Sequence, residues 1–127
     1  MSALRCFLVE DSPTIRAELT AALEEMLPLQ VLAWADTEAD ALAWLAQPGH
    51  DCELILIDLF LKRGSGINVL AQTGHLQGAA KRVVLSNYAT PDVRRRCLAL
   101  GADRVFDKSS EIEELLDYCR ELAAQPH

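Results

Sequence analysis

The fold is decided by the stretch Cys52-Glu53-Leu54-Ile55-Leu56-Ile57-Asp58, which continues as Leu59-Phe60-Leu61-Lys62-Arg63-Gly64-Ser65-Gly66. The run 54–57 is wholly apolar, without the polar alternation of a half-buried strand. Such a run is typical of a parallel strand that helices cover on both faces. Asp58 then falls at the carboxyl end of the strand, and in open α/β sheets this edge binds ligands. The two glycines allow the following loop an unusual backbone path.

Three further apolar runs also end in polar side chains. Residues 4–9 are followed by Glu10 and Asp11, residues 83–85 by Ser86, and the weaker run around residues 105–106 is closed by Lys108. Because the carboxyl ends of parallel strands share one edge of a sheet, we expect these side chains to converge on Asp58.

Apolar runs alternate with segments of helical periodicity along the whole chain. Strands are expected at residues 4–9, 29–34, 54–58, 82–86 and 103–106. The intervening helices are expected to begin at Pro13, after a cap at Asp36 or Thr37, at Ile67, at Thr90-Pro91, and at a Ser110–Glu113 capping box; the third should fade near Gly74 and Gly78, and Gly101 should end the fourth. This alternation predicts an α/β fold, a doubly wound parallel sheet of five strands with right-handed crossovers.

Length and composition indicate one domain over residues 1–127. The net charge of −7 argues against non-specific binding to nucleic acid or anionic membranes, and no apolar run reaches the roughly 20 residues of a membrane span. We therefore expect a cytoplasmic protein. Its four cysteines lack CxxC spacing, which favours buried thiols over disulfides or zinc ligands.

The expected cluster of Glu10, Asp11 and Asp58 needs a cation. Two carboxylates about 4 Å apart repel by roughly 4 kcal/mol at an effective dielectric constant near 20. Lys108 supplies one positive charge, and hard oxygen ligands without nearby His or Cys favour Mg²⁺ for the rest. Beside such a metal, Asp58 could act as a nucleophile toward a phosphoryl group, with Ser86 and Lys108 contacting its oxygens.

With these residues in this order, nearly the whole chain resembles the receiver domain of bacterial two-component response regulators, in a stand-alone form similar to chemotaxis regulators. Gly66 and the run Gly101-Ala102-Asp103 fit the same pattern. The resemblance implies a flavodoxin-like (βα)5 fold with strand order 2-1-3-4-5.

The resemblance also implies a function in two-component or phosphorelay signalling. Asp58 would accept a phosphoryl group from a phosphohistidine on a sensor histidine kinase or a histidine phosphotransfer protein. Mg²⁺ would be held by Glu10 or Asp11, by Asp58, and by the main-chain carbonyl of Phe60. Such a protein is no metabolic enzyme, although it catalyses its own aspartyl phosphorylation and dephosphorylation. It would signal through contacts with an output protein that the sequence does not identify, as a monomer or a phosphorylation-dependent dimer.

Three positions bear on how such a receiver would signal. In the family the hydroxyl residue, here Ser86, moves toward the phosphoryl group while an aromatic residue of the fifth strand turns inward. Val105 stands at the aromatic position, and the neighbouring Phe106 should face the opposite side of the strand. Phe60 and Tyr88 stand at positions that flank the phosphoryl group, and their bulk predicts slow autodephosphorylation.

Two other functions stay open from the sequence. One is a phosphorylation-independent interaction module, in which Val105 marks a lost switch. The other is a small Mg²⁺-dependent aspartyl phosphohydrolase, against which Phe60 speaks because it stands where the general-acid Asp would be. The basic run Arg94-Arg95-Arg96 is compatible with either a solvated helix face or a surface for docking a partner.

Overall fold

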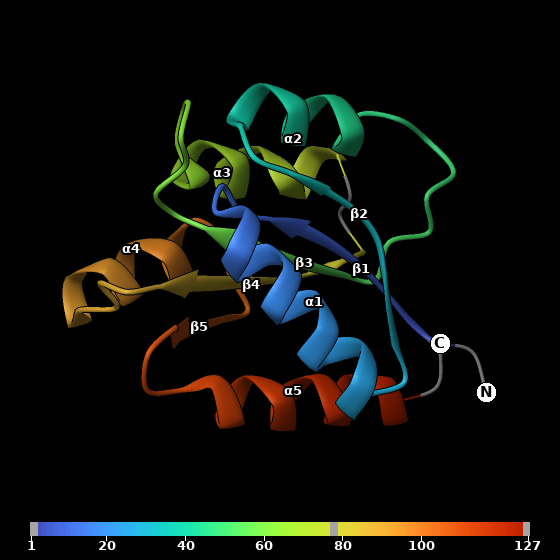
Figure 1. Ribbon diagram of the computed structural model, residues 1–127. Helices are drawn as coiled ribbons and strands as arrows, with labels where there is room; N and C mark the ends of the chain where they lie inside the picture. The colour runs from blue at the N-terminus through green and yellow to red at the C-terminus, as the bar shows by residue number, and fades with distance from the viewer. Residues whose placement is uncertain (1–2, 77–78, 126–127) are drawn as a thin grey trace.

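The computed structural model of the chain describes residues 3–76 and 79–125. Within them, five parallel strands alternate with five helices (Figure 1), and the strand order is β2-β1-β3-β4-β5. The predicted doubly wound, flavodoxin-like fold is therefore confirmed. The elements, in chain order, are β1 (Leu4–Val9), α1 (Pro13–Met26), β2 (Leu29–Ala35), α2 (Glu38–Leu45), β3 (Leu54–Asp58), α3 (Gly66–Leu76), β4 (Lys81–Ser86), α4 (Pro91–Ala99), β5 (Arg104–Asp107) and α5 (Ile112–Ala124).

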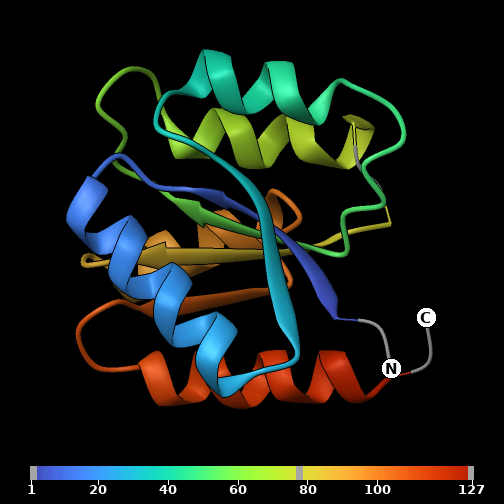
Figure 2. The same cartoon turned by 45° about the vertical axis from the view of Figure 1, so that its right-hand side comes forward.

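Helices cover both faces of the sheet, as Figure 2 shows most clearly for α1 and α5 on one side and α2 and α3 on the other. β3 lies in the middle of the sheet and all five of its residues are buried. Leu54 and Leu56 pack with α1 and α5, whereas Ile55 and Ile57 pack with α2, α3 and α4. The unbroken apolar run thus fills two cores, one on each face.

The predicted helix starts at Pro13 and Thr90 are confirmed. The Ser12 hydroxyl caps α1 by accepting a hydrogen bond from the Ile15 amide at 3.2 Å, and Pro13 occupies the first helical position. The Thr90 hydroxyl caps α4 in the same way, and Thr37 rather than Asp36 caps α2. Gly101 follows α4 with φ +105°, a left-handed conformation that favours glycine.

One local expectation, the capping box before the last helix, was wrong. Ser110 and Glu113 form no capping box: α5 begins at Ile112, and its N-cap residue Glu111 makes no side-chain capping bond. The Ser110 amide donates instead to the Asp107 carboxylate at 3.2 Å, so the turn after β5 satisfies one of the two amides that a capping box would have used. The third helix ends at Leu76, two residues after Gly74, close to where it was expected to fade. Gly78 lies outside the described residues.

The cysteines are buried free thiols, as predicted; they are Cys6, Cys52, Cys97 and Cys119. No helix in residues 3–76 or 79–125 has the length and apolar character needed to cross a membrane.

Candidate functional site

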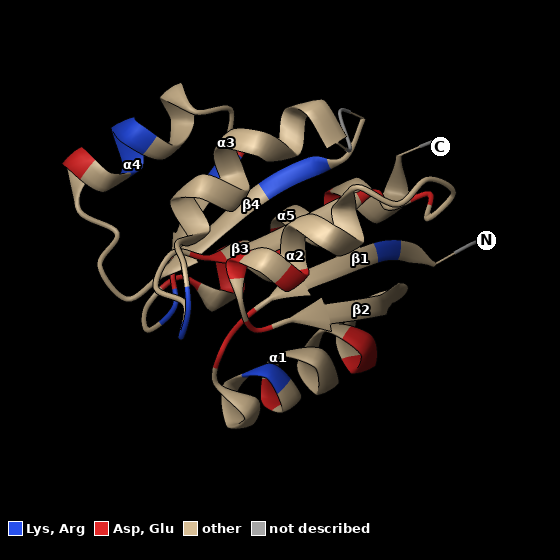
Figure 3. Cartoon of the chain, turned by 90° about the horizontal axis from the view of Figure 1, so that it is seen from above, with Lys and Arg blue, Asp and Glu red and all other residues tan. Residues whose placement is uncertain are grey.

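The carboxyl edge of the sheet gathers the residues predicted to converge. Val9, the last residue of β1, pairs with Ile57 of β3, which brings Glu10 and Asp11 beside Asp58. Figure 3, with acidic residues in red, shows the segment after β1 close to the end of β3. On the other side of β3, Ser86 ends β4, and Lys108 directly follows β5.

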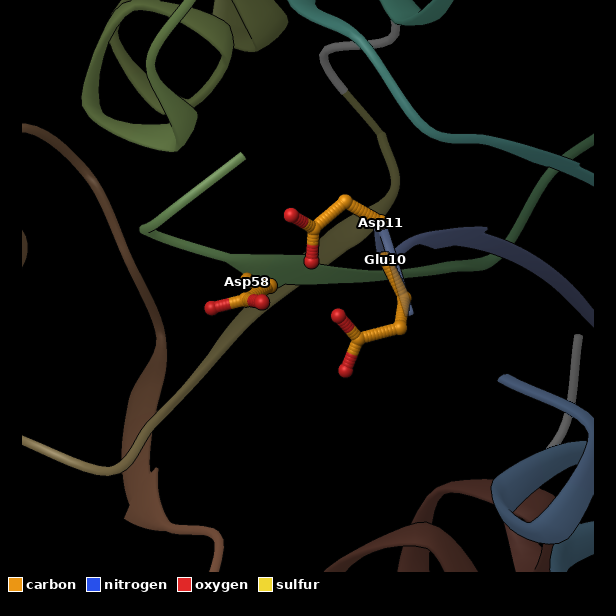
Figure 4. Close-up of side chains that lie close together, drawn as sticks. All are labelled: Glu10, Asp11 and Asp58. Atoms are coloured by element: carbon orange, nitrogen blue, oxygen red, sulfur yellow. The ribbon is translucent and has the colours of Figure 1, made fainter. Parts of the chain in front are cut away.

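Glu10, Asp11 and Asp58 turn their carboxyl groups toward a shared space (Figure 4), and one oxygen from each lies within 4.8 Å of the others. Glu10 is only 1% exposed and Asp58 only 7%, while Asp11 is partly exposed. Within the described residues, the buried Oε2 atom of Glu10 accepts no hydrogen bond. A buried anionic oxygen without a donor is costly, and a cation can supply what the protein does not.

Lys108 reaches into this cluster from the turn after β5. Its Nζ donates to Asp58 Oδ2 at 3.1 Å and to the Glu10 carboxylate. Burial alone would lower the pKa of Lys108, but the hydrogen bond to Glu10 and the negative charge of Asp58 outweigh it, and the pKa is raised. Burial raises the pKa of Glu10, and Asp58 adds to this effect while Lys108 opposes it.

The Asp58 carboxylate is also held by its own strand end. Its Oδ1 accepts a hydrogen bond from the Phe60 amide at 3.2 Å. Ser86 is fully buried; its hydroxyl accepts from the Tyr88 amide at 3.0 Å, and its carbonyl accepts from the Lys108 amide at 3.1 Å. Within the described residues, no hydrogen bond joins the Ser86 hydroxyl to Asp58.

Two exposed aromatic rings stand at the rim of the site. Phe60 is 58% exposed and Tyr88 is 64% exposed, and their rings meet edge to face with centroids 5.3 Å apart. Each follows a site residue by two positions, so the end of β3 and the end of β4 are bridged by an aromatic contact.

Gly66 fits against the backbone of the phosphoacceptor candidate. A Cβ atom at position 66 would lie 2.0 Å from the carbonyl oxygen of Asp58, so only glycine fits there. Gly64 is required for another reason, because its φ is +85°. The predicted unusual backbone path is confirmed at Gly64 by its positive φ, whereas Gly66 begins α3 and is required by its close contact with the Asp58 carbonyl.

Sequence patterns missed the residue that ties this loop to α2. Glu38 Oε1 accepts from the Ser65 amide at 2.8 Å and from the Asn68 side chain at 3.3 Å, and the Glu38 amide donates to the main-chain carbonyl of Arg63. Glu38 and Ser65 are 27 residues apart, and no spacing rule links them. The contact orders the backbone between Asp58 and α3.

The β5 side of the site contains a buried valine and a structural arginine. Val105 packs in the core with α4, while Phe106 packs on the opposite face, as predicted. Arg94 donates to the carbonyls of Ala89 (2.8 Å) and Val105 (3.0 Å) and also bonds Glu111. Arg94 is therefore more than a solvated residue, because its guanidinium joins the loop after β4 to β5 and to Glu111, the N-cap residue of α5; docking of a partner on the arginine run stays a prediction.

The donor set fits a divalent cation. All three candidate ligands are carboxylates, which hard cations prefer, and one has a buried oxygen without a partner among the described residues. One ammonium against three carboxylates leaves the cluster negatively charged.

Comparisons with known proteins place this geometry in context. Residues 6–120 match the response regulator receiver domain. A LuxR-family two-component response regulator from Aurantimonas sp. SI85-9A1 superposes with a TM-score of 0.85 at 23% identity, over 97% of this chain and 86% of that one. The response regulator domain of Thermotoga maritima CheB gives a TM-score of 0.83 at 17% identity, over 98% of this chain and 99% of that one.

A response regulator from Burkholderia pseudomallei, solved with a phosphorylated aspartic acid, a calcium ion and citrate, gives a TM-score of 0.78 at 24% identity, over 94% of this chain and 68% of that one. Comparison with curated protein sequences gave no match. The match over residues 6–120, together with the fold, means that the chain belongs to the response regulator receiver domain family.

Proposed function

We propose that this receiver domain is phosphorylated on Asp58 by a phosphohistidine of a sensor histidine kinase or a histidine phosphotransfer protein. A carboxylate oxygen of Asp58 attacks phosphorus, and the bond from phosphorus to the imidazole nitrogen breaks with its electron pair leaving on nitrogen. The observation that carries the proposal is a cluster of three carboxylates, two of which, Glu10 and Asp58, are paired with the largely buried ammonium of Lys108. This arrangement supplies both a nucleophile and the cationic surroundings that phosphoryl transfer requires.

The other residues of the edge have separate roles in this proposal. Lys108 offsets charge on the phosphoryl oxygens, and the Ser86 hydroxyl donates a hydrogen bond to one of them. The Phe60 amide, which donates to Asp58 Oδ1 at 3.2 Å, orients the carboxylate before the reaction. Because Ser86 Oγ accepts from the Tyr88 amide, its hydrogen is free to point elsewhere, and the loop after β4 moves with the hydroxyl.

We assign the cation to Mg²⁺, with Glu10 or Asp11, Asp58 and the main-chain carbonyl of Phe60 as its ligands. Carboxylates without His or Cys favour Mg²⁺, and Glu10 Oε2, which has no hydrogen-bond partner in the described part of the chain, supports a cation in this position. When bound, Mg²⁺ supplies positive charge that stabilises the transferring phosphoryl group. The Burkholderia pseudomallei regulator, solved with a phosphorylated aspartic acid and a calcium ion, supports an aspartyl phosphorylation site and a divalent cation in this proposal.

Signalling in this proposal uses Ser86 and its loop rather than a rotating ring. Val105 is 7% exposed, packs in the core and carries no aromatic ring that could rotate. A shift of Ser86 reaches Ala89, whose carbonyl Arg94 binds, and through Arg94 it reaches β5 and Glu111. The output is a contact with a protein partner in the cytoplasm, and the free thiols are compatible with its reducing conditions.

Intact mass after incubation with acetyl phosphate and MgCl₂ tests the proposal. We expect a mass increase of one phosphoryl group that requires the divalent cation and is absent in Asp58→Asn. Asp117→Asn, an exposed acid on α5, is the matched control and should be phosphorylated normally. A folded wild type without adduct would favour a phosphorylation-independent interaction module, and steady hydrolysis of a phosphate ester would favour a phosphohydrolase. Either result would overturn the proposal.

A further inference from the structure

Asp11 differs from its two acidic neighbours in how it is held. Glu10 and Asp58 are both fixed by Lys108, and Asp58 also by the Phe60 amide. Within the described residues, no hydrogen bond or ion pair holds the Asp11 side chain, although its oxygen lies within 4.8 Å of the other two. Its position must therefore be set by the backbone on either side of it.

That backbone is held by a closed ring of contacts between β1, α1 and β2. The Glu10 amide donates to the Ala35 carbonyl at 3.0 Å, and the Glu10 carbonyl accepts from the Arg16 guanidinium at 3.2 Å. The Arg16 guanidinium lies over the Trp34 ring, with 3.5 Å from Cζ to the ring centroid. Trp34 directly precedes Ala35 in β2, so the contacts form a closed circuit that runs from Glu10 through Arg16, Trp34 and Ala35 back to Glu10.

The other side of Asp11 is fixed by the same arginine. The main-chain amide of Arg16 donates to the Ser12 carbonyl at 2.9 Å, the first hydrogen bond of α1. Arg16 thus bonds the residue before Asp11 with its side chain and the residue after it with its backbone. Trp34 is 52% exposed, so its ring contributes little to the core, and core packing does not explain its contact with Arg16.

We infer that Arg16 and Trp34 are positioning residues that fix the Glu10-Asp11 turn for the divalent cation. The Arg16 guanidinium fixes the turn by donating to the Glu10 carbonyl. The Trp34 ring, stacked against the guanidinium, keeps it oriented for this hydrogen bond. This inference rests on the proposed function, because it assumes that the acidic cluster binds the cation. It adds two residues, one of them on the edge strand β2, that lie outside the cluster itself.

The charge of Arg16 and its positioning role predict opposite changes in cation affinity when Arg16 is removed. Arg16 carries a positive charge close to a negatively charged site, so removing it should strengthen cation binding if charge were its only influence. If Arg16 positions the turn, its removal should weaken cation binding. The sign of the change in affinity therefore separates the two explanations.

The test measures the Kd for Mn²⁺, a probe of oxygen-ligand sites, from the electron paramagnetic resonance signal of the free ion, with MgCl₂ as competitor. Arg16→Met should raise the Kd about tenfold, as the loss of an outer-shell contact does. Arg16→Lys keeps the charge but loses the planar group, and it should also raise the Kd. Trp34→Leu should raise the Kd about two- to fivefold, the range for losing one cation–π contact.

The double variant Arg16→Met/Trp34→Leu should bind Mn²⁺ no more weakly than Arg16→Met, because both changes break the same circuit of contacts around the Glu10-Asp11 turn. Arg120→Met, which removes an exposed arginine from α5, is the matched control and should leave the Kd unchanged. The Mg²⁺ concentration for half-maximal phosphorylation should rise in the Arg16 variants, while the rate at saturating Mg²⁺ stays near that of the wild type.

The outcomes separate the two claims. If the wild type binds Mn²⁺ and Arg16→Met binds it equally well or more tightly, the positioning role is overturned and the proposed function stands. If the wild type binds no divalent cation, the cation site falls, and the positioning role falls with it. Circular dichroism checks that each variant is folded, and Arg16→Lys, the least disruptive change, decides the question if Arg16→Met unfolds.

Discussion

Replacing Gly66 with alanine should displace the backbone of Asp58 and with it the reacting carboxylate. The new Cβ would start 2.0 Å from the Asp58 carbonyl oxygen and 2.7 Å from the Leu59 Cα. Ordinary van der Waals contact begins at 3.4 Å, so the first pair must separate by about 1.4 Å. Both opposing atoms belong to the backbone, so no rotation of a side chain can relieve the contact.

A shift of that size is large for catalysis and moderate for stability. Displacing a reacting group by about 1 Å costs about 100-fold in rate, which we expect for phosphorylation of Gly66→Ala by acetyl phosphate. Inserting the methyl group into packed surroundings should cost about 1–3 kcal/mol of unfolding free energy. Rates are measured by intact mass over time, and stability by urea denaturation.

Gly49→Ala is the control that separates these two effects. Gly49 has φ +88°, and no atom of the residues that the structure describes lies within 4 Å of the added Cβ, so alanine there strains only its own backbone, at about 1–2 kcal/mol. It should lose a similar amount of stability and keep the wild-type phosphorylation rate. If folded Gly66→Ala were phosphorylated as fast as Gly49→Ala, the claim that the Gly66 contact sets the position of Asp58 would be refuted.

Three further predictions concern the rim, the turn before α5 and the core. Replacing Phe60 and Tyr88 together with small polar residues should speed loss of phosphate roughly tenfold, about 1.4 kcal/mol of barrier, because water then reaches the phosphoryl group; an unchanged half-life in ³²P decay would refute a shielding role. The hydrogen bond from Arg94 lowers the pKa of Glu111 from 4.5. The ionised Glu111 carboxylate therefore contributes its full stabilisation of the folded protein above pH 4.5, and this contribution is lost as the pH falls through the lowered pKa of the folded state. Glu111→Gln should therefore cost about 1 kcal/mol in urea denaturation at neutral pH, and its difference from the wild type should vanish in acid; a pH-independent difference would contradict this. Burial raises the pKa of the Cys52 thiol to about 11 and that of Cys119 to about 12, so Ellman's reagent at about pH 8 should label no cysteine in the folded protein and all four after denaturation.

The fold and the five convergent residues could be predicted because the signals for them are local. A strand buried on both faces needs an unbroken apolar run, and such a run ending in Asp58 fixes both the strand and the edge at which it ends. Helix caps are also local signals. The capping hydroxyl stands three residues before the amide that donates to it, so the pair can be recognised in the sequence. Once the strands are parallel, the convergence of their ends follows from topology.

Contacts between segments far apart in the chain could not be predicted from such patterns. Glu38, Arg94 and Arg16 are ordinary helical residues by spacing, and each acts on a loop or strand of another element. The failed capping box has a related cause. The sequence offers Ser110 as a cap, but Asp107 accepts the Ser110 amide and Glu111 accepts the Asp107 amide, so a network across the turn replaces the local motif.

The balance of charge at the carboxyl edge explains how one group of residues can serve both folding and binding. At an effective dielectric constant near 20, two carboxylates 4.8 Å apart repel by about 3.5 kcal/mol, whereas Lys108 and Asp58 at 3.1 Å attract by about 5 kcal/mol. One ammonium between two of the three carboxylates therefore offsets most of their repulsion, and the edge can fold without a metal. A second lysine would relieve the remaining repulsion but would also neutralise the site. With Lys108 alone, negative charge remains on Asp11, and Glu10 keeps an oxygen that has no hydrogen-bond partner among residues 3–76 and 79–125; these two features attract a divalent cation.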